Sequence, residues 1–438
     1  MSKHVNKVTA AGLLVALGII YGDIGTSPLY VFNSIIKGRV VDETLILGTL
    51  SLIIWTITLL TTIKYVVMVL RADNRGEGGI FSLFALVRRR KKWLVIPAMI
   101  GGAALLSDGI ITPPISITSA IEGLKELPQF HDLSQNTIVY IVLGIIAIFF
   151  FAQQFGTSSI GKLFGPFMSV WFGMLAILGL VHLSDDFTIF RALNPYYGIR
   201  FLVTYPEGFW LLGAVFLCTT GAEALYSDLG HCGRGNIRIS WIFVKTCLLI
   251  NYFGQGASIL KHHSGKLLDK ATIDAEGINA FYDLMPNWFI VPGVIVATSA
   301  AIIASQAMVS GSFTLISEAI RLNLWPKLKI NYPTEAKGQI FIPAINTLLF
   351  AGCVGVVLFF RESSKMEAAY GLAIITTMFM TTILFANYMV LHRVKPLFIY
   401  VFLTAYVIVE SAFLIALMDK FIHGGYITLM IGFLLFSV

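Results

Sequence analysis

A carboxylate lies in the middle of an apolar stretch near the start of the chain. Asp23 is surrounded by Gly22, Gly25 and Pro28, which together disfavour a continuous helix. A charge at membrane depth is costly unless a cation accompanies it, and irregular backbone is tolerated there only inside protein or beside a cavity. The sequence therefore predicts a broken helix whose freed carbonyl oxygens and carboxylate bind a small, hard cation.

The chain as a whole is too apolar for a soluble fold. Of its 438 residues, 57% are hydrophobic and 13% are charged. This composition is typical of an all-α, multi-pass membrane protein. The net charge of +7 does not indicate nucleic acid binding, because most Lys and Arg residues flank apolar runs.

Apolar runs of spanning length predict twelve transmembrane helices. We expect them at 9–36, 44–70, 94–121, 136–155, 163–182, 207–226, 239–260, 288–318, 341–360, 367–392, 397–417 and 422–438. Lys and Arg are more frequent in the loops on the side of the N-terminus, above all in the run 88–92, which predicts a cytoplasmic N-terminus. The last run reaches Val438 without a polar flank, so we expect a cytoplasmic C-terminal domain to follow.

A second helix break is predicted at 219–225, where Gly221 precedes Glu223. Paired interrupted helices at corresponding positions of two halves are typical of an inverted-repeat transporter. We therefore expect a transport core at 1–392, with five-helix repeats at about 9–182 and 207–392 and broken spans one and six, and two added spans at 393–438. Chance placement of glycine, which is frequent in membrane helices, is the alternative for the second break.

The third predicted span carries a polar stripe. Asp108, Thr112 and Ser116 are spaced four residues apart and share one helix face. The prolines Pro113 and Pro114 remove two backbone donors beside them. The stripe offers only oxygen ligands, which suits a hard monovalent cation and not a transition metal. The alternative is that the hydroxyls bond to neighbouring helices.

Glu223 is the third deep carboxyl group. A carboxyl in a low-dielectric cavity exchanges protons near neutral pH, so Glu223 is a candidate proton carrier. It is alternatively a cation ligand or a protonated hydrogen-bonding group. Lys64 and Lys245 lie towards the ends of their spans, and we expect both to reach the membrane surface. For Glu410 we expect an interhelical hydrogen bond.

The motifs of this chain resemble those of the KUP/HAK/KT family of potassium uptake permeases. The resemblance runs from residue 12 to about residue 390. The segments that carry it are 22–30 (GDIGTSPLY), 74–79 (NRGEGG), 108–113 (DGIITP), 221–231 (GAEALYSDLGH), 341–346 (FIPAIN) and 370–373 (YGLA).

The resemblance implies proton-coupled potassium import at the plasma membrane on a LeuT-type scaffold of the amino acid–polyamine–organocation superfamily. It implies potassium contacts from Asp23, Tyr30, Asp108, Thr112, Ser116, Thr220 and Tyr370, with Glu223 as the proton-coupling site. It implies no cofactor beyond the transported ions. Further expectations are a homodimer and, through the missing C-terminal region, regulation by a cyclic dinucleotide.

Three other function classes are open to test. An amino acid permease of the same fold is disfavoured because Asp23 repels a substrate carboxylate, whereas a polyamine permease is harder to exclude. A channel needs a symmetric ring of ligands, which this asymmetric set does not supply. No nucleophile–base or metal constellation indicates an enzyme, and the four dispersed cysteines predict neither disulfides nor a thiolate metal site.

Overall fold

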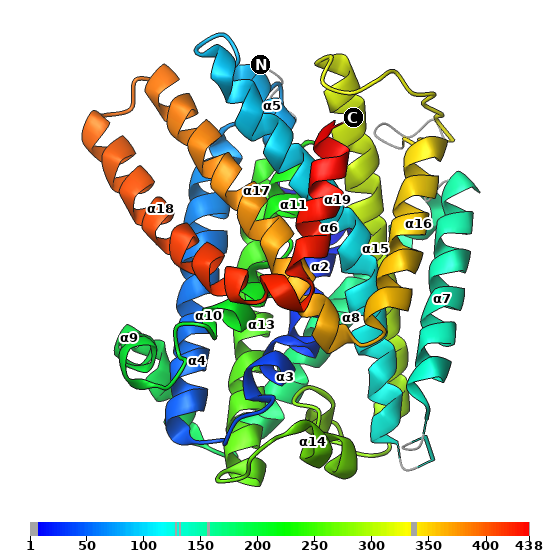
Figure 1. Cartoon of the computed structure of the whole chain (residues 1–438), viewed down its shortest axis with the longest axis vertical. Helices are drawn as coiled ribbons and strands as arrows, with labels where there is room; N and C mark the ends of the chain where they lie inside the picture. Colours follow the sequence, from blue (N-terminus) through cyan, green and yellow to red (C-terminus); the bar gives the residue numbers. More distant parts are fainter. Residues whose placement is uncertain (1–7, 128, 131–132, 156–157, 334–339, 438) are drawn as a thin grey trace.

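The computed structural model describes residues 8–127, 129–130, 133–155, 158–333 and 340–437. Within these ranges the secondary structure is helical, and only isolated bridges such as Val40–Leu267 occur in place of strands. Long helices run roughly side by side along the longest axis of the molecule (Figure 1). This arrangement satisfies the backbone of every long segment internally, as a membrane requires.

Nine α-helices of fourteen or more residues form the body of the protein. They are α4 (Glu43–Thr56), α6 (Val95–Glu122), α7 (Gln135–Ala152), α8 (Ser158–Leu183), α13 (Arg234–His263), α15 (Ile290–Arg321), α16 (Pro343–Phe360), α17 (Ser363–Leu391) and α18 (Pro396–Asp419). The π-helical segment η2 (Ile57–Met68) and the 3₁₀ turn η3 (Val69–Arg71) continue α4 without a gap.

Shorter elements lie between the long helices. The α-helices are α1 (Ala10–Ile19), α2 (Gly22–Thr26), α3 (Val31–Ile36), α5 (Ile80–Val87), α9 (Pro195–Thr204), α10 (Leu212–Val215), α11 (Ala222–Ser227), α12 (Leu229–Cys232), α14 (Lys270–Glu276) and α19 (Tyr426–Ser437). The other turns are η1 (Ser27–Leu29), η4 (Lys92–Leu94), η5 (Gly123–Glu126), η6 (Gln153–Phe155), η7 (Phe187–Leu193), η8 (Phe216–Thr219), η9 (Tyr282–Leu284) and the π-helical η10 (Phe421–Gly425).

Fewer helices qualify as membrane spans than the twelve that the sequence predicts. In the described part of the chain, nine are long and apolar enough, or ten if the bent pair Ala10–Ile19 and Gly22–Leu29 counts as one span. The predicted span 207–226 is divided among α10, η8 and α11, each of four to six residues. The predicted span 422–438 contains α19, whose 12 residues rise only about 18 Å, less than a bilayer core.

The first break has the predicted location and a measurable bend. The axis turns by 64° between α1 and the segment Gly22–Leu29. Pro28 occupies an early position of η1, where its missing N–H removes no hydrogen bond. A Cβ at Gly22 would lie 2.6 Å from the Cα of Ala304, so only glycine allows α15 to approach this closely.

The second break needs a conformation that favours glycine. Thr220 is extended (φ −52°, ψ 146°) and Gly221 is left-handed (φ 81°, ψ −7°). The chain then re-enters a helix at Ala222, which places Glu223 in the first turn of α11. Both predicted breaks therefore exist, and they carry Asp23 and Glu223 into the interior, where these side chains are 1% and 3% exposed.

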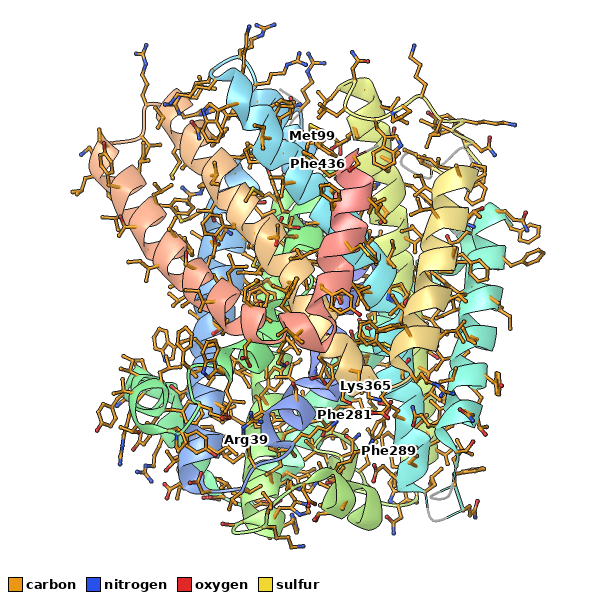
Figure 2. All side chains as sticks on the ribbon, viewed as in Figure 1. Arg39, Met99, Phe281, Phe289, Lys365 and Phe436 are labelled. Carbon is orange, nitrogen blue, oxygen red and sulfur yellow. The ribbon has the colours of Figure 1, made fainter. Side chains whose placement is uncertain are left out.

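The last two helical elements fold back onto the core. α18 is inclined against α17, and α19 returns along α6 and α17 (Figure 1). With all side chains drawn, Met99 of α6 and Phe436 of α19 lie at one end of the molecule, and Arg39, Phe281 and Lys365 lie towards the other (Figure 2).

Candidate cation site at two broken helices

Asp23 has one satisfied and one unsatisfied carboxylate oxygen. Its Oδ1 accepts a hydrogen bond of 2.6 Å from the Tyr370 hydroxyl of α17. Its Oδ2 is buried and has no hydrogen-bond partner among the described residues. An unpaired buried carboxylate oxygen is costly, so it marks a position where a cation or a proton would be stabilised.

The two helix breaks touch each other at this carboxylate. A Cβ at Gly221 would lie 2.8 Å from the Ile24 nitrogen and 3.2 Å from Asp23 Oδ2. The missing side chain at Gly221 is therefore what lets the second break lie against the first. Segments almost two hundred residues apart in sequence thus meet at Asp23.

Hydroxyl groups from both breaks lie beside this contact. Thr220 Oγ1 is 2.9 Å from Ser27 Oγ and 3.3 Å from the Tyr30 hydroxyl. The rings of Tyr30 and Tyr370 meet edge to face, with centroids 6.2 Å apart. All four side chains are buried. The sequence did not single out Ser27, although it lies in the same motif as Asp23 and Tyr30.

The polar stripe of α6 completes the oxygen-rich region. Thr112 donates a hydrogen bond of 2.9 Å to Asp108 Oδ1. Ser116, one turn further along the helix, is 3.5 Å from the Thr26 hydroxyl of α2. Asp108 is 3% exposed, and Thr112 and Ser116 are fully buried. The predicted alignment of the three side chains is therefore present, and the stripe faces the first break.

The carbonyl oxygens freed by the first break are not all available, in contrast to the prediction. Gly25 O accepts from Trp171 Nε1 of α8 at 3.0 Å, and Pro28 O accepts from Gln255 Nε2 of α13 at 3.1 Å. Leu29 O accepts from Asn33 at 3.1 Å. Neighbouring side chains thus stabilise the unwound backbone, and side-chain oxygens dominate the candidate cation ligands.

Glu223 lies in a separate polar cluster. Tyr65, in the second half of η2, donates a short hydrogen bond to Glu223 Oε1. Lys64 is fully buried and pairs with Glu410 of α18 at 2.5 Å. The prediction that Lys64 reaches the membrane surface is therefore wrong. The expected interhelical hydrogen bond of Glu410 does occur, since Thr382 of α17 donates to it at 2.9 Å.

The structure therefore brings the predicted residues together in two groups. Asp23, Tyr30, Thr220 and Tyr370 meet directly at the two breaks, and Asp108, Thr112 and Ser116 line the adjoining face of α6. Glu223 contacts Tyr65 instead. Nothing in the sequence pointed to the partners Trp171, Gln255, Tyr65 and Lys64, because their positions depend on how distant helices pack.

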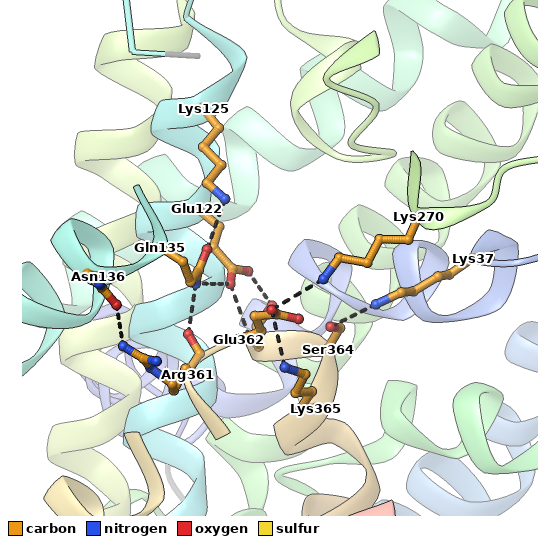
Figure 3. A network of polar contacts seen from close by, with 11 residues as sticks. Lys37, Glu122, Lys125, Gln135, Asn136, Lys270, Arg361, Glu362, Ser364 and Lys365 are labelled. Carbon is orange, nitrogen blue, oxygen red and sulfur yellow. Dashed lines mark hydrogen bonds and ion pairs between the residues drawn. The ribbon is translucent and has the colours of Figure 1, made fainter. Parts of the chain in front are cut away.

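A cavity of about 380 Å³ reaches the candidate site from one end of the molecule. Tyr30 forms part of its lining, together with charged residues from the ends of α3, α6, α14 and α17. These charges pair with one another: Glu362 contacts Lys270 at 3.5 Å and Lys365 at 3.2 Å (Figure 3). A small hydrated ion has room in this cavity.

One carboxyl group of this cavity joins the two helices that carry candidate ligands. Glu122, at the end of α6, accepts hydrogen bonds from the backbone nitrogen (3.1 Å) and the hydroxyl of Ser363, the first residue of α17. A carboxylate at a helix N-terminus is stabilised by the free N–H groups there. This contact lies two turns before Tyr370 on α17 and fixes α17 relative to α6.

The site has no features of a transition-metal centre. No group of three or more His, Cys, Asp and Glu side chains suited to a metal ion occurs among the described residues. The four cysteines are buried and free. Cys353 instead donates to Ile110 O, one of the carbonyls beside Pro113 and Pro114. A multi-pass membrane protein with a buried, oxygen-lined site at two broken helices is the class these features define.

Comparison with known proteins places the chain within that class. Residues 10–438 match the model of the K+ potassium transporter integral membrane domain. The chain therefore belongs to this family, as the resemblance of its motifs predicts.

Several curated relatives are similar over nearly the whole chain. A probable potassium transport system protein Kup of Cytophaga hutchinsonii is 60% identical, with 97% of this chain and 63% of the relative covered. A protein of the same description from Flavobacterium johnsoniae is 56% identical, with 99% and 65% covered. One from Clostridium perfringens is 53% identical, with 99% and 67% covered. The chain thus spans about two thirds of the length of these relatives.

Proposed function

We propose that this protein is a secondary active transporter that imports potassium ions. The observation that carries the proposal is the buried Asp23 Oδ2, which has no hydrogen-bond partner in the described part of the chain and lies where two broken helices meet. Family membership and the printed descriptions of the relatives support potassium as the substrate.

The chemistry of the candidate ligands supports a monovalent, hard cation. Carboxylate, hydroxyl and phenol oxygens surround the contact between the breaks. Asp23 lies at the first break, and Asp108 lies on the stripe of α6 that faces this break. A cation between them would offset their repulsion, whereas an anionic substrate would increase it.

We infer that the scaffold is the LeuT-type inverted repeat, with repeats at about 9–182 and 207–392. The two breaks support it, because each interrupts a helix in the corresponding position of its half and the two lie against each other. The charged cavity that reaches Tyr30 supports an access route from one side of the membrane. Alternating access would close this route and open one at the opposite end.

Proton coupling is proposed through Glu223. Glu223 is 3% exposed, and its carboxyl group accepts a hydrogen bond from Tyr65. It is separate from the hydroxyl groups that lie around Asp23. A carboxyl that takes up a proton without touching the ion couples the two gradients if both ligands favour the same closed state.

We propose that the protein lies in the plasma membrane with its N-terminus in the cytoplasm. Dimerisation and cyclic dinucleotide regulation remain proposals, the latter tied to the part of the relatives beyond this chain.

Competition for uptake tests the substrate. The protein is reconstituted in liposomes, and rubidium uptake is measured with potassium, sodium, spermidine or an amino acid as competitor. We expect potassium to compete strongly and the organic substrates not to compete. Competition by spermidine with no effect of potassium would instead indicate a polyamine permease.

Replacing Glu223 tests the coupling. Glu223→Gln mimics the protonated carboxyl, so we expect it to retain potassium binding but to lose accumulation driven by an imposed pH gradient at clamped membrane potential. Full accumulation by Glu223→Gln would contradict the role in coupling. Loss of binding as well would reassign Glu223 to the cation site.

A further inference from the structure

Lys64 is a fully buried ammonium with a dedicated counter-ion. Its Nζ lies 2.5 Å from Glu410 Oε1 and donates at 2.8 Å to Met378 O of α17. Both charged side chains are 0% exposed. A buried ion pair is seldom the most stable solution for a core, since apolar residues of similar volume often serve as well. Its presence therefore calls for a functional explanation.

The ion pair is connected to Glu223 through Tyr65. Lys64 Nζ lies over the Tyr65 ring, 4.8 Å from the centroid, and the Tyr65 hydroxyl donates to Glu223. A cation over the face of a ring polarises it and strengthens the hydroxyl as a donor. The order Glu410, Lys64, Tyr65, Glu223 thus forms a continuous series of polar contacts from α18 to α11.

The backbone that carries Lys64 and Tyr65 is held from outside the cluster. η2 is a π-helical segment, a form that occurs mostly as short insertions and frequently at functional sites. α13 braces it: Arg238 donates to the carbonyl oxygens of Val66 and Val67 at 3.0 Å, and Trp241 Nε1 donates to Thr62 at 3.0 Å. These contacts fix the positions of Lys64 and Tyr65 relative to α11.

We propose that Lys64 is a positioning residue for proton coupling: an internal cation, balanced by Glu410, that acts through Tyr65 on the charge of Glu223. This inference rests on the proposed role of Glu223 and deepens it. It also assigns α18, which lies outside the two expected repeats, to the coupling machinery.

The balance of charges predicts two opposite effects. Lys64 lies next to Tyr65, which bonds to Glu223, whereas Glu410 lies on the far side of Lys64 in this series of contacts. Removing only the Glu410 charge leaves an uncompensated cation, which favours the charged form of Glu223. Removing both charges takes away the net attraction, which favours the protonated form. A pair with only a structural role would produce no such opposition.

Other ionisable groups lie on the elements that carry or adjoin this cluster and must stay constant in the test. They are Asp108 of α6, Tyr226 of α11, one turn after Glu223, and Tyr406 of α18, one turn before Glu410.

The experiment measures the pH at which proton-driven rubidium uptake into liposomes falls to half on the alkaline side. Glu410→Gln is expected to move this midpoint to lower pH by about one unit, because Glu223 loses its proton earlier. The double variant Lys64→Met with Glu410→Gln is expected to move it to higher pH by about half a unit or more. Lys261→Met serves as a control with an unchanged midpoint, because it removes a lysine charge whose partner, Asp185 in the loop after α8 at 2.7 Å, lies outside this cluster.

The outcomes separate the inference from the function on which it rests. If both variants move the midpoint in one direction, or neither moves it, Lys64 and Glu410 are structural and the inference is wrong. If Glu410→Gln fails to fold because of its lone buried ammonium, the electrically neutral double variant decides alone: an upward shift supports the inference and an unchanged midpoint overturns it. Failure of the proposed coupling is recognised separately, since Glu223→Gln would then retain uphill accumulation.

Discussion

Asp23 is the residue whose surroundings differ most from those of an ordinary core carboxyl. One oxygen accepts a hydrogen bond from Tyr370, and the other is buried with no hydrogen-bond partner among the residues that the structure describes. Asp108 lies on the facing helix with one oxygen held by Thr112. Each carboxyl group therefore keeps capacity to accept a ligand while its orientation is fixed.

Neutralising either carboxyl should weaken ion binding severely. Asp23→Asn and Asp108→Asn each remove a formal charge from a partly dehydrated site, so we expect a loss of about 100-fold or more in apparent affinity. Rubidium uptake by purified variants at matched incorporation into liposomes measures this loss. Wild-type affinity in one variant would remove that residue from the site.

Thr112 separates ligand chemistry from packing. Thr112→Val keeps the shape and removes the hydroxyl that donates to Asp108. We expect the rubidium concentration for half-maximal uptake to rise about fivefold, from loss of roughly 1 kcal/mol of hydrogen bonding. A lower melting temperature with unchanged affinity would show instead that the hydroxyl only joins helix to helix.

Individual site residues were predictable from the sequence only where a charged side chain lies in an apolar run, because burying that charge costs free energy. Asp23, Asp108 and Glu223 lie in apolar runs, where a carboxyl group requires an explanation. The assignment of Lys64 to the membrane surface was wrong because its partner Glu410 is 346 residues away and became its neighbour only through packing. Tyr370, 347 residues from Asp23, was expected at the site only through the family resemblance.

At the scale of elements, the contact between the two breaks depends on one glycine. Gly221→Ala adds a Cβ 2.8 Å from the Ile24 nitrogen, in addition to the strain of a positive φ. We expect Gly221→Ala to lose rubidium binding as well as thermal stability, because the added Cβ would push Ile24 and Asp23 of the first break away from the second break.

Gly38 provides a matched control for that substitution. Its φ of +75° is nearly the same, but no heavy atom lies within 4 Å of a Cβ built there. Gly38→Ala should therefore lower the free energy of unfolding only by the strain of a positive φ, about 1 kcal/mol, and leave binding unchanged. Equal loss of binding in both variants would mean that backbone strain, and not the close approach of the breaks, explains the effect.

The breaks themselves were predictable, and the elements around them less so. Glycine and proline in apolar runs favour irregular backbone, and both breaks occur as predicted, although α6 continues as a helix through Pro113 and Pro114. The donors Trp171 and Gln255, which occupy the Gly25 and Pro28 carbonyls, come from other helices and left no local signal. The same holds for the π-helical form of η2, whose sequence reads as an ordinary apolar helix.

For the whole molecule, ion pairs at the loop ends hold long helices together. Asp185, just after α8, contacts Lys261 of α13 and His182, each at 2.7 Å. Burial raises the pKa of Asp185, but the hydrogen bonds with Lys261 and His182 outweigh it and hold the pKa below its ordinary value of 3.8. A lowered native pKa stabilises the fold above the unfolded value, and this stabilisation is lost as pH falls through the native value.

Asp185→Asn should therefore destabilise the protein in a pH-dependent way. At pH 7 we expect a melting temperature about 2 °C lower than that of the unmodified protein, since partly exposed pairs contribute about 1 kcal/mol or less. Below about pH 3 the two proteins should melt alike, because Asp185 is then protonated. Thermal denaturation in detergent at both pH values measures this, and a difference that does not depend on pH would contradict the assignment.

The overall class of the molecule was predictable from composition, whereas the number of spans was not. Hydropathy identifies apolar runs but does not show that 207–226 is divided into short pieces or that the helix in 422–438 has only 12 residues. The packing of α18 and α19 on α17 likewise depends on the finished fold.

Locating a bound ion tests the cation site most directly. Crystals of the protein soaked with rubidium give an anomalous signal at the ion. We predict a peak in contact with Asp23 Oδ2, between the second break at Thr220–Gly221 and the α6 face that carries Asp108, Thr112 and Ser116. A strong peak elsewhere in the membrane region, with none at Asp23, would contradict the proposal that the two broken helices form the transport site.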